Sequence, residues 1–144
     1  MFGFKHIQLV FLVSSVLTVS AQQNQADSIR LLLEKELPDS SRAYNMMMLA
    51  MYTEQLDIEK AHAIYAEAVD FSLSCGLDYF AGLALYYEVT PYHNSGNRIR
   101  QRENLFRAID LLKNSEHPNA KSQLGAVYGG LANYYRAFEK HDSA

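Results

Sequence analysis

The feature that most constrains this 144-residue chain is an interval between an aromatic and a small residue that occurs twice. Tyr52 lies nine residues before Ala61, and Tyr135 lies nine residues before Ala144. From Ala61 the chain continues as Ala-x3-Tyr-x2-Ala, whose three named positions share one side of a helix. Small residues let two helices approach closely, and an aromatic between them fills the facing groove. The sequence therefore predicts pairs of closely packed helices.

The last seventeen residues give this pattern a family likeness. They read YGGLANYYRAFEKHDSA, with Leu131-Ala132 three and four residues after the first aromatic and Tyr135 seven after it. This run resembles the first half of a tetratricopeptide repeat, W-x2-L-G-x2-Y followed by Ala. The resemblance implies an all-α, right-handed superhelix of antiparallel helix pairs, with about two and a half repeats after a lead-in helix. The repeat-packing positions that it assigns are Tyr52, Ala61, Tyr65, Ala68, Ala108, Tyr128, Leu131, Ala132, Tyr135 and Ala144.

Composition bounds the class of protein. The chain is 49% hydrophobic and has ten Tyr but only three Pro, so it holds enough apolar material for one ordered domain. Its formal net charge of -3, from 13 Lys and Arg against 16 Asp and Glu, provides no overall basic field for a phosphate backbone. We therefore expect no nucleic acid partner for this segment.

The N-terminus is typical of a secretory signal peptide. A short basic start ending at Lys5 precedes a nearly apolar run over residues 7–19 and the small-residue end Val19-Ser20-Ala21. An uncleaved anchor is the alternative, but the run is shorter than the roughly 20 residues of a spanning helix. The sequence predicts a signal peptide over 1–21 and export to the periplasm or envelope of a bacterium. Membrane contact is expected only through this segment or a span beyond residue 144.

The mature chain divides into a lead-in helix over 22–39 and repeat units over 40–76, 77–118 and 119–144. Asp57 is expected to cap the second helix of the first unit, and Gly76 to end it. In the middle unit, Pro91 is expected to break or kink the first helix. The segment 90–97 should then form a loop that lengthens the repeat.

The last unit is expected to be cut short. Its first helix should run to about Phe138, with a turn over 139–142 and Ala144 opening the second helix. The apolar stripe of that first helix would then lack a cover, so we expect the native protein to continue, or self-association through this edge. The stripe consists of Leu124, Val127, Tyr128, Leu131 and Tyr135.

Signatures of catalysis and of metal or cofactor binding are lacking. The histidines of the mature chain have no zinc-ligand spacing, Cys75 is the single cysteine, and no phosphate-binding glycine loop is present. Gly125, Gly129 and Gly130 lie in a helical pattern, where we expect them to allow close helix approach. We expect no enzyme activity, no cofactor and no metal in this segment.

The resemblance also places a partner-binding groove on the first helix of each unit. Carried over by register, its positions include Glu54 in the first unit, Tyr86 in the middle one, and Asn133 and Arg136 in the last. Asn133 could hold a peptide backbone and Arg136 a carboxylate through charge-assisted hydrogen bonds. A solvated helix face is the alternative for this pair.

Two functions follow as expectations. The first is a protein-protein interaction or sensory scaffold, the exported repeat region of a larger bacterial signalling protein such as a histidine kinase or a transcriptional regulator. The alternative is a stand-alone secreted or periplasmic adaptor with tetratricopeptide repeats. Both take a protein or peptide partner, and neither involves catalysis in this segment.

Overall fold

The computed structural model describes residues 20–142, with side chains up to residue 137, and helices joined by short turns make up this range. No strand occurs within this range, which confirms the predicted all-α class. A first helix covers residues 20–33. It is followed by α2 (Asp39–Thr53), α3 (Ile58–Ser74), α4 (Asp78–Tyr87), α5 (Val89–Asn94), α6 (Arg98–Asn114) and α7 (Ala120–Asp142).

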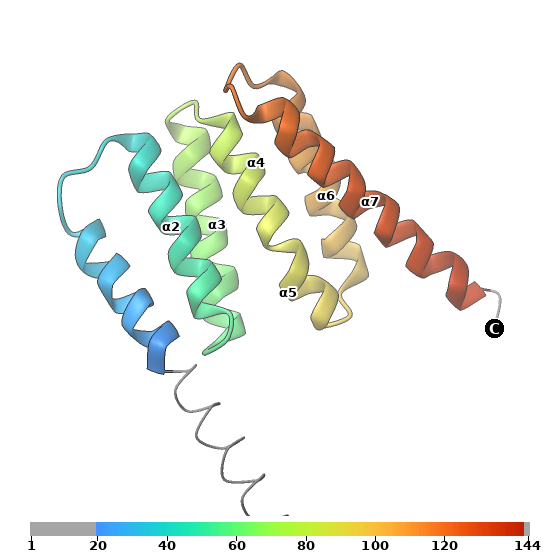
Figure 1. Cartoon of the computed structure of the whole chain (residues 1–144), viewed down its shortest axis with the longest axis horizontal. Helices are drawn as coiled ribbons and strands as arrows, with labels where there is room; N and C mark the ends of the chain where they lie inside the picture. The colour runs from blue at the N-terminus through green and yellow to red at the C-terminus, as the bar shows by residue number, and fades with distance from the viewer. Residues whose placement is uncertain (1–19, 143–144) are drawn as a thin grey trace, which may run out of the picture.

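The helices lie side by side in chain order (Figure 1). Helix α2 packs on α3, α4 packs on α6, and α7 closes the row against α6. The first helix of each pair also contacts the next, α2 with α4 and α4 with α7. Each helix is therefore covered mainly by its sequence neighbours, as in a repeat array.

Local residues explain the short turns between the helices. The Asp57 side chain accepts a hydrogen bond of 3.0 Å from the backbone N–H of Lys60 and caps α3. Gly76 follows α3 with φ of 69°, a left-handed conformation that glycine adopts without a Cβ clash. Gly96 repeats this device after α5 with φ of 72°. The caps and stops expected at Asp57 and Gly76 are both present.

The middle unit differs from the prediction. The helix bends at Glu88, and Pro91 lies in the first turn of α5. A proline is tolerated there because the backbone nitrogens of a first turn make no hydrogen bond within the helix. Only Ser95, Gly96 and Asn97 separate α5 from α6, so the predicted loop over 90–97 is wrong. The unit is longer than a plain repeat because its first helix is extended by α5.

The chain ends of the described region also differ from expectation. The first helix stops at residue 33, a few residues before the expected end, and Pro38 occupies the N-cap position of α2. Helix α7 runs on to Asp142, so the turn predicted over 139–142 is wrong, since no glycine or proline interrupts the helix there. The predicted signal peptide over 1–21 lies almost wholly outside the described residues, and Ala144 lies outside them too.

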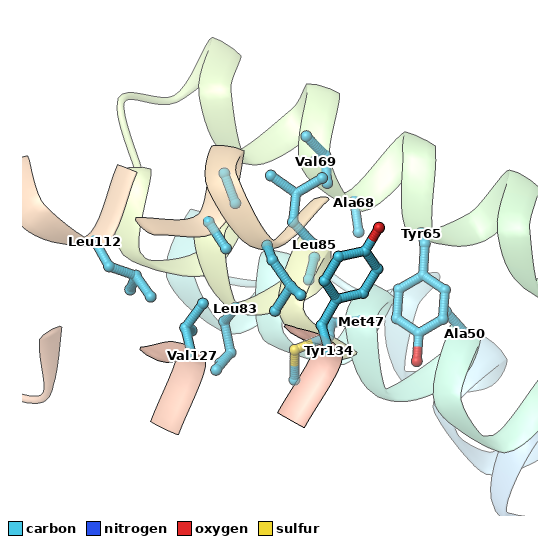
Figure 2. Packing of buried hydrophobic residues seen from close by; sticks show 14 residues of the cluster. Met47, Ala50, Tyr65, Ala68, Val69, Leu83, Leu85, Leu112, Val127 and Tyr134 are labelled. Carbon is cyan, nitrogen blue, oxygen red and sulfur yellow. The ribbon is translucent and has the colours of Figure 1, made fainter. Parts of the chain in front are cut away.

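The core lies between the helix pairs and draws on α2, α3, α4, α6 and α7 (Figure 2). Its largest fully enclosed apolar side chains are Tyr65, Leu85, Leu105, Leu112 and Val127. Ala61, Ala68 and Ala108 have no exposed surface, so the small residues of the repeat pattern lie at helix contacts.

The repeat-packing residues of α7 lie in places that differ from the prediction. Val127 and Tyr134 of α7 are buried, as Figure 2 shows, whereas Tyr128, Tyr135 and Ala132 are exposed. Leu131 is partly buried against the core, and Tyr52 is intermediate. The core-facing residues of α7 are Ala120, Val127 and Tyr134, which are seven residues apart. The register that the family pattern gives, with Tyr128 and Tyr135 in the core, is therefore wrong by one residue.

Two glycines mark close helix approaches. A Cβ built on Gly82 would lie 2.9 Å from Leu112 Cγ and 3.3 Å from the Ala108 carbonyl oxygen, so α4 and α6 meet there. A Cβ on Gly130 would lie 3.3 Å from the side chains of both Leu105 and Tyr86. Gly125 and Gly129 have nothing within 4 Å. The predicted close approach of two helices is thus confirmed at Gly130, and the prediction is wrong for Gly125 and Gly129.

This contrast predicts opposite effects of one substitution. Gly82→Ala should lower the free energy of unfolding by about 1 kcal/mol, because overpacking outweighs the gain from removing a helical glycine. Gly125→Ala should raise it by about 0.5 to 1 kcal/mol, since only the helix-propensity gain remains. Urea denaturation of both variants measures the difference. Equal effects would contradict the close approach at Gly82.

Candidate functional site

A hollow lies between the bent helix α4–α5 and α7, with a volume of about 470 Å³. Its α4–α5 wall consists of Tyr86, Tyr87, Val89, Thr90 and His93, and its α7 wall of Gly130, Asn133, Tyr134 and Ala137. Gly96, Arg98 and Gln101 close one end. We call this hollow the groove. It lies between α4 with its extension α5 and the long helix α7.

The chemistry of the groove is aromatic and polar, with a positive bias. Three tyrosines supply ring faces, and Arg98 supplies a guanidinium, while no Asp or Glu is among the described lining residues. Gln101 Nε2 lies 3.4 Å from His93 Nδ1, which joins the end of α5 to α6. Such a lining suits a neutral or anionic ligand with an apolar part.

The structure brings three of the four predicted groove residues together. Tyr86 and Asn133 face each other across the groove. Arg136, one turn further along α7, donates a hydrogen bond of 3.1 Å from Nη1 to Asn133 Oδ1. Glu54 lies elsewhere, at the C-terminal end of α2, where its carboxylate accepts a hydrogen bond from the Tyr65 hydroxyl. The predicted position of Glu54 in a common groove is therefore wrong.

Sequence reasoning missed the contribution of α5. His93 lies in the segment that we expected to be a loop, so no helical register was assigned to it, whereas Thr90 had been placed in the groove by register together with Tyr86. The helical spacing of Tyr86, Thr90 and His93 was available, but Pro91 suggested a break. Tyr87 was missed because α4 is apolar nearly all round, which leaves no polar face from which to set its orientation.

A buried polar cluster supports the α5 wall from behind. The carboxylate of Glu88, which is only 6% exposed, lies where α4 and α5 meet. Its Oε1 lies 2.8 Å from His62 Nδ1 on α3, and its Oε2 accepts a hydrogen bond of 2.8 Å from Asn104 Nδ2 on α6. The Tyr92 ring stacks on His62 with centroids 4.3 Å apart, beside this carboxylate.

These contacts make Glu88 a positioning residue for the groove. No buried side-chain nitrogen or oxygen within the described residues lacks a hydrogen-bond partner, so the cluster meets the requirement for burying a carboxylate. The Glu88 carboxylate ties α3, α5 and α6 to the bend between α4 and α5. The direction of α5, and with it the Val89–His93 wall of the groove, follows from these hydrogen bonds.

Burial also shifts the protonation of neighbouring groups. It raises the pKa of Glu54, partly offset by the Tyr65 hydrogen bond. It raises the pKa of the Tyr65 hydroxyl well above its usual range, and the hydrogen bond to Glu54 adds to the shift. It raises the pKa of Tyr92 to about 12, with Glu88 as the next cause.

Three other features bear on function: metal-binding groups, the cysteine thiol and membrane-spanning helices. Within the described residues, no group of three His, Cys, Asp or Glu side chains is arranged to hold a metal ion. Cys75 is a free, partly buried thiol beside Ser74. None of the helices in the described part of the chain has the length and apolar character of a membrane span.

The raised pKa of Glu54 predicts how one variant changes stability with pH. A raised folded-state pKa favours folding fully below the ordinary value of 4.5, and this contribution is lost as pH rises through the folded-state value. Glu54→Gln should therefore be more stable than the wild type at pH 7, with the difference shrinking toward pH 4. Chemical denaturation across this range measures it. The exposed Glu67→Gln should show no such trend, and a matching trend would contradict the assignment to Glu54.

Tyr92 predicts the corresponding behaviour in alkali. Its contribution to stability is complete below pH 10 and disappears as pH rises through about 12, since the unfolded tyrosine ionises first. Tyr92→Phe should lose less stability between pH 10 and 12 than the wild type does. Tyr44→Phe, at an exposed tyrosine, should follow the wild type. Thermal melts at increasing pH would test both, and parallel curves for all three would contradict the prediction.

Comparison with known proteins adds no assignment. No family model matches the sequence, no curated protein matches it, and no solved structure matches the fold. The likeness to tetratricopeptide repeats therefore rests on the residues of this chain alone, and its function has to be argued from the geometry of the groove.

Proposed function

We propose that this chain is a protein-interaction module in which the groove between α4–α5 and α7 holds a segment of a partner protein. The observation that carries the proposal is the hollow of about 470 Å³ that joins Tyr86 to Asn133 without any acidic lining residue. The helices would form a right-handed superhelix of the tetratricopeptide type, with this groove on its inner face.

The groove offers both kinds of contact that an extended peptide needs. The amides of Asn133 and Gln101 can each donate and accept hydrogen bonds with a peptide backbone. The rings of Tyr86 and Tyr87 supply apolar surface for a side chain of the peptide. Arg136 is not part of the groove lining but donates a hydrogen bond to the side chain of Asn133, and in this proposal it binds a carboxylate of the ligand.

The biological setting that we propose is the exported interaction or sensory region of a larger bacterial signalling protein. The signal-peptide pattern over 1–21 and the row of helix pairs support it. The output domain would be a histidine kinase or a transcriptional regulator, and catalysis is not proposed for this segment. A stand-alone secreted or periplasmic adaptor would use the same groove in the same way.

Selection from a displayed peptide library tests the groove directly. Peptides enriched on the immobilised chain should combine an aromatic or large aliphatic residue with an acidic one, because the groove is aromatic and lacks acids. Tyr87→Ala and Asn133→Ala should each weaken such a peptide by about tenfold, as expected for the loss of one aromatic or hydrogen-bonding contact. Fluorescence anisotropy of a labelled peptide gives the Kd.

The matched control is Tyr44→Ala, which removes another exposed tyrosine from α2, outside the groove. It should leave the Kd unchanged. Circular dichroism of each variant separates lost binding from lost folding. The proposal fails if no peptide is enriched, or if Tyr44→Ala weakens binding as much as Tyr87→Ala does.

A further inference from the structure

The groove adjoins a second hollow, of about 720 Å³, that lies along α6. Arg98 and Tyr134 line both hollows, so the two meet at the N-terminal end of α6. The other lining residues of the second hollow include Ile99, Arg102, Phe106 and Arg107. We call it the arginine hollow. A ligand that fills the groove therefore reaches a further surface when it passes Arg98 and Tyr134.

The arginine hollow carries an excess of positive charge. Four arginines and one acid, Glu103, are among its described lining residues. Arg100 Nη1 lies 3.2 Å from Glu103 Oε2, so these two charges balance each other. Arg102 and Arg107 form no ion pair with an acid in the described part of the chain. Both of these arginines are exposed, so their guanidinium groups are accessible to an anionic ligand.

Exposed apolar side chains lie beside these arginines. Ile99 is 74% and Phe106 is 44% exposed. Arg102 lies about one turn before Phe106 on the same helix face, and its guanidinium carbon is 5.7 Å from the centre of the Phe106 ring. A guanidinium that lies over a ring still directs its N–H groups at a carboxylate in its own plane. The hollow therefore offers charged donors next to apolar surface.

The positive charge is confined to this end of the chain. Residues 20–97 carry four Arg and Lys against eleven Asp and Glu, a net charge of -7 with His neutral. Residues 98–137 carry seven Arg and Lys against three Asp and Glu, a net charge of +4. A long polyanion such as a nucleic acid needs an extended basic track, and the acidic helices before α6 do not provide one. A short acidic stretch of a polypeptide matches the extent of the charge.

We infer that the partner segment held in the groove carries an acidic stretch beside its apolar anchor, and that this stretch binds in the arginine hollow. The inference rests on the function proposed above and adds to it a second binding site and the charge of the ligand. The carboxylates of the stretch accept charge-assisted hydrogen bonds from Arg102 and Arg107. The apolar anchor lies against the rings of Tyr86 and Tyr87 in the groove.

Three labelled synthetic peptides test the inference by fluorescence anisotropy. The anionic probe joins one phenylalanine to a run of glutamates. The neutral probe has glutamines in place of the glutamates, and the anchorless probe has serine in place of the phenylalanine. The anionic probe should bind at least about tenfold more tightly than either of the others, because each of these lacks one set of contacts. Added salt should narrow its advantage over the neutral probe, since exposed charges are screened.

A double variant tests the arginine hollow itself. Arg102→Gln with Arg107→Gln should weaken binding of the anionic probe by about tenfold or more and leave the neutral probe unchanged. The matched control is Lys113→Gln with Lys121→Gln, which removes the same charge at two exposed positions outside both hollows. This control should leave the Kd of both probes nearly unchanged. Circular dichroism establishes that every variant is folded.

Three outcomes would overturn the inference. The first is an anionic probe that binds no more tightly than the neutral or the anchorless probe. The second is a lysine control that weakens the anionic probe as much as the arginine variant does, which would mean that only overall charge matters. The third is displacement of the anionic probe by an oligouridylate at a lower concentration than by the unlabelled probe, which would indicate a nucleic acid ligand.

Failure of the proposed function would give a different result. Tyr87→Ala would then leave the Kd of every probe unchanged, and the anchor on which this inference rests would be lost as well. If Tyr87→Ala weakens the neutral and the anionic probe while the two bind equally to the wild type, the groove stands and the arginine hollow alone is excluded.

Discussion

The structure depends on one buried carboxylate. Glu88 lies where the helix of the middle unit bends, and burying its carboxylate is tolerated because His62 of α3 and Asn104 of α6 lie within hydrogen-bond distance of its two oxygens. His62, Asn104 and Tyr92 meet at this point because α3, α5 and α6 converge there. The same hydrogen bonds that satisfy the carboxylate thus determine the direction of α5, and a wall of the groove follows from that direction.

Predictions from the sequence were right for features that depend on short-range residue patterns. They were wrong where tertiary contacts determine the structure. Ala61, Tyr65 and Ala68 were correctly expected at a helix contact, because small and aromatic residues at helical spacing constrain their own surroundings. The interruption expected near Pro91 is present as the bend at Glu88, but the loop predicted over 90–97 is wrong. The cost of a proline depends on its position within a helix, and the bend that places Pro91 in a first turn is held by distant partners of Glu88. Likewise, Val127 and Tyr128 are adjacent residues that could each pack in a core, and the contacts of α7 with α6 and α4 decide that Val127 is the buried one.

Part of the candidate site could be predicted from the sequence for the same reason. Tyr86 and Asn133 were found by register, since both lie on regular helices. Glu54 was misplaced because the register could not show that its carboxylate would turn toward the Tyr65 hydroxyl within the first helix pair. The residues that close the groove, such as His93 and Gln101, come from elements whose relative position has no local signature in the sequence.

Helix α7 has two flanks of different character. One flank carries Gly130, where the absence of a side chain lets Leu105 and Tyr86 approach, and Asn133, which faces the groove. The opposite flank carries Tyr128 and Tyr135, which are about half exposed within the described part of the chain. A small or polar flank that packs beside its own chain and an aromatic flank that faces outward have different uses. The first flank is the one that contributes to the proposed peptide groove.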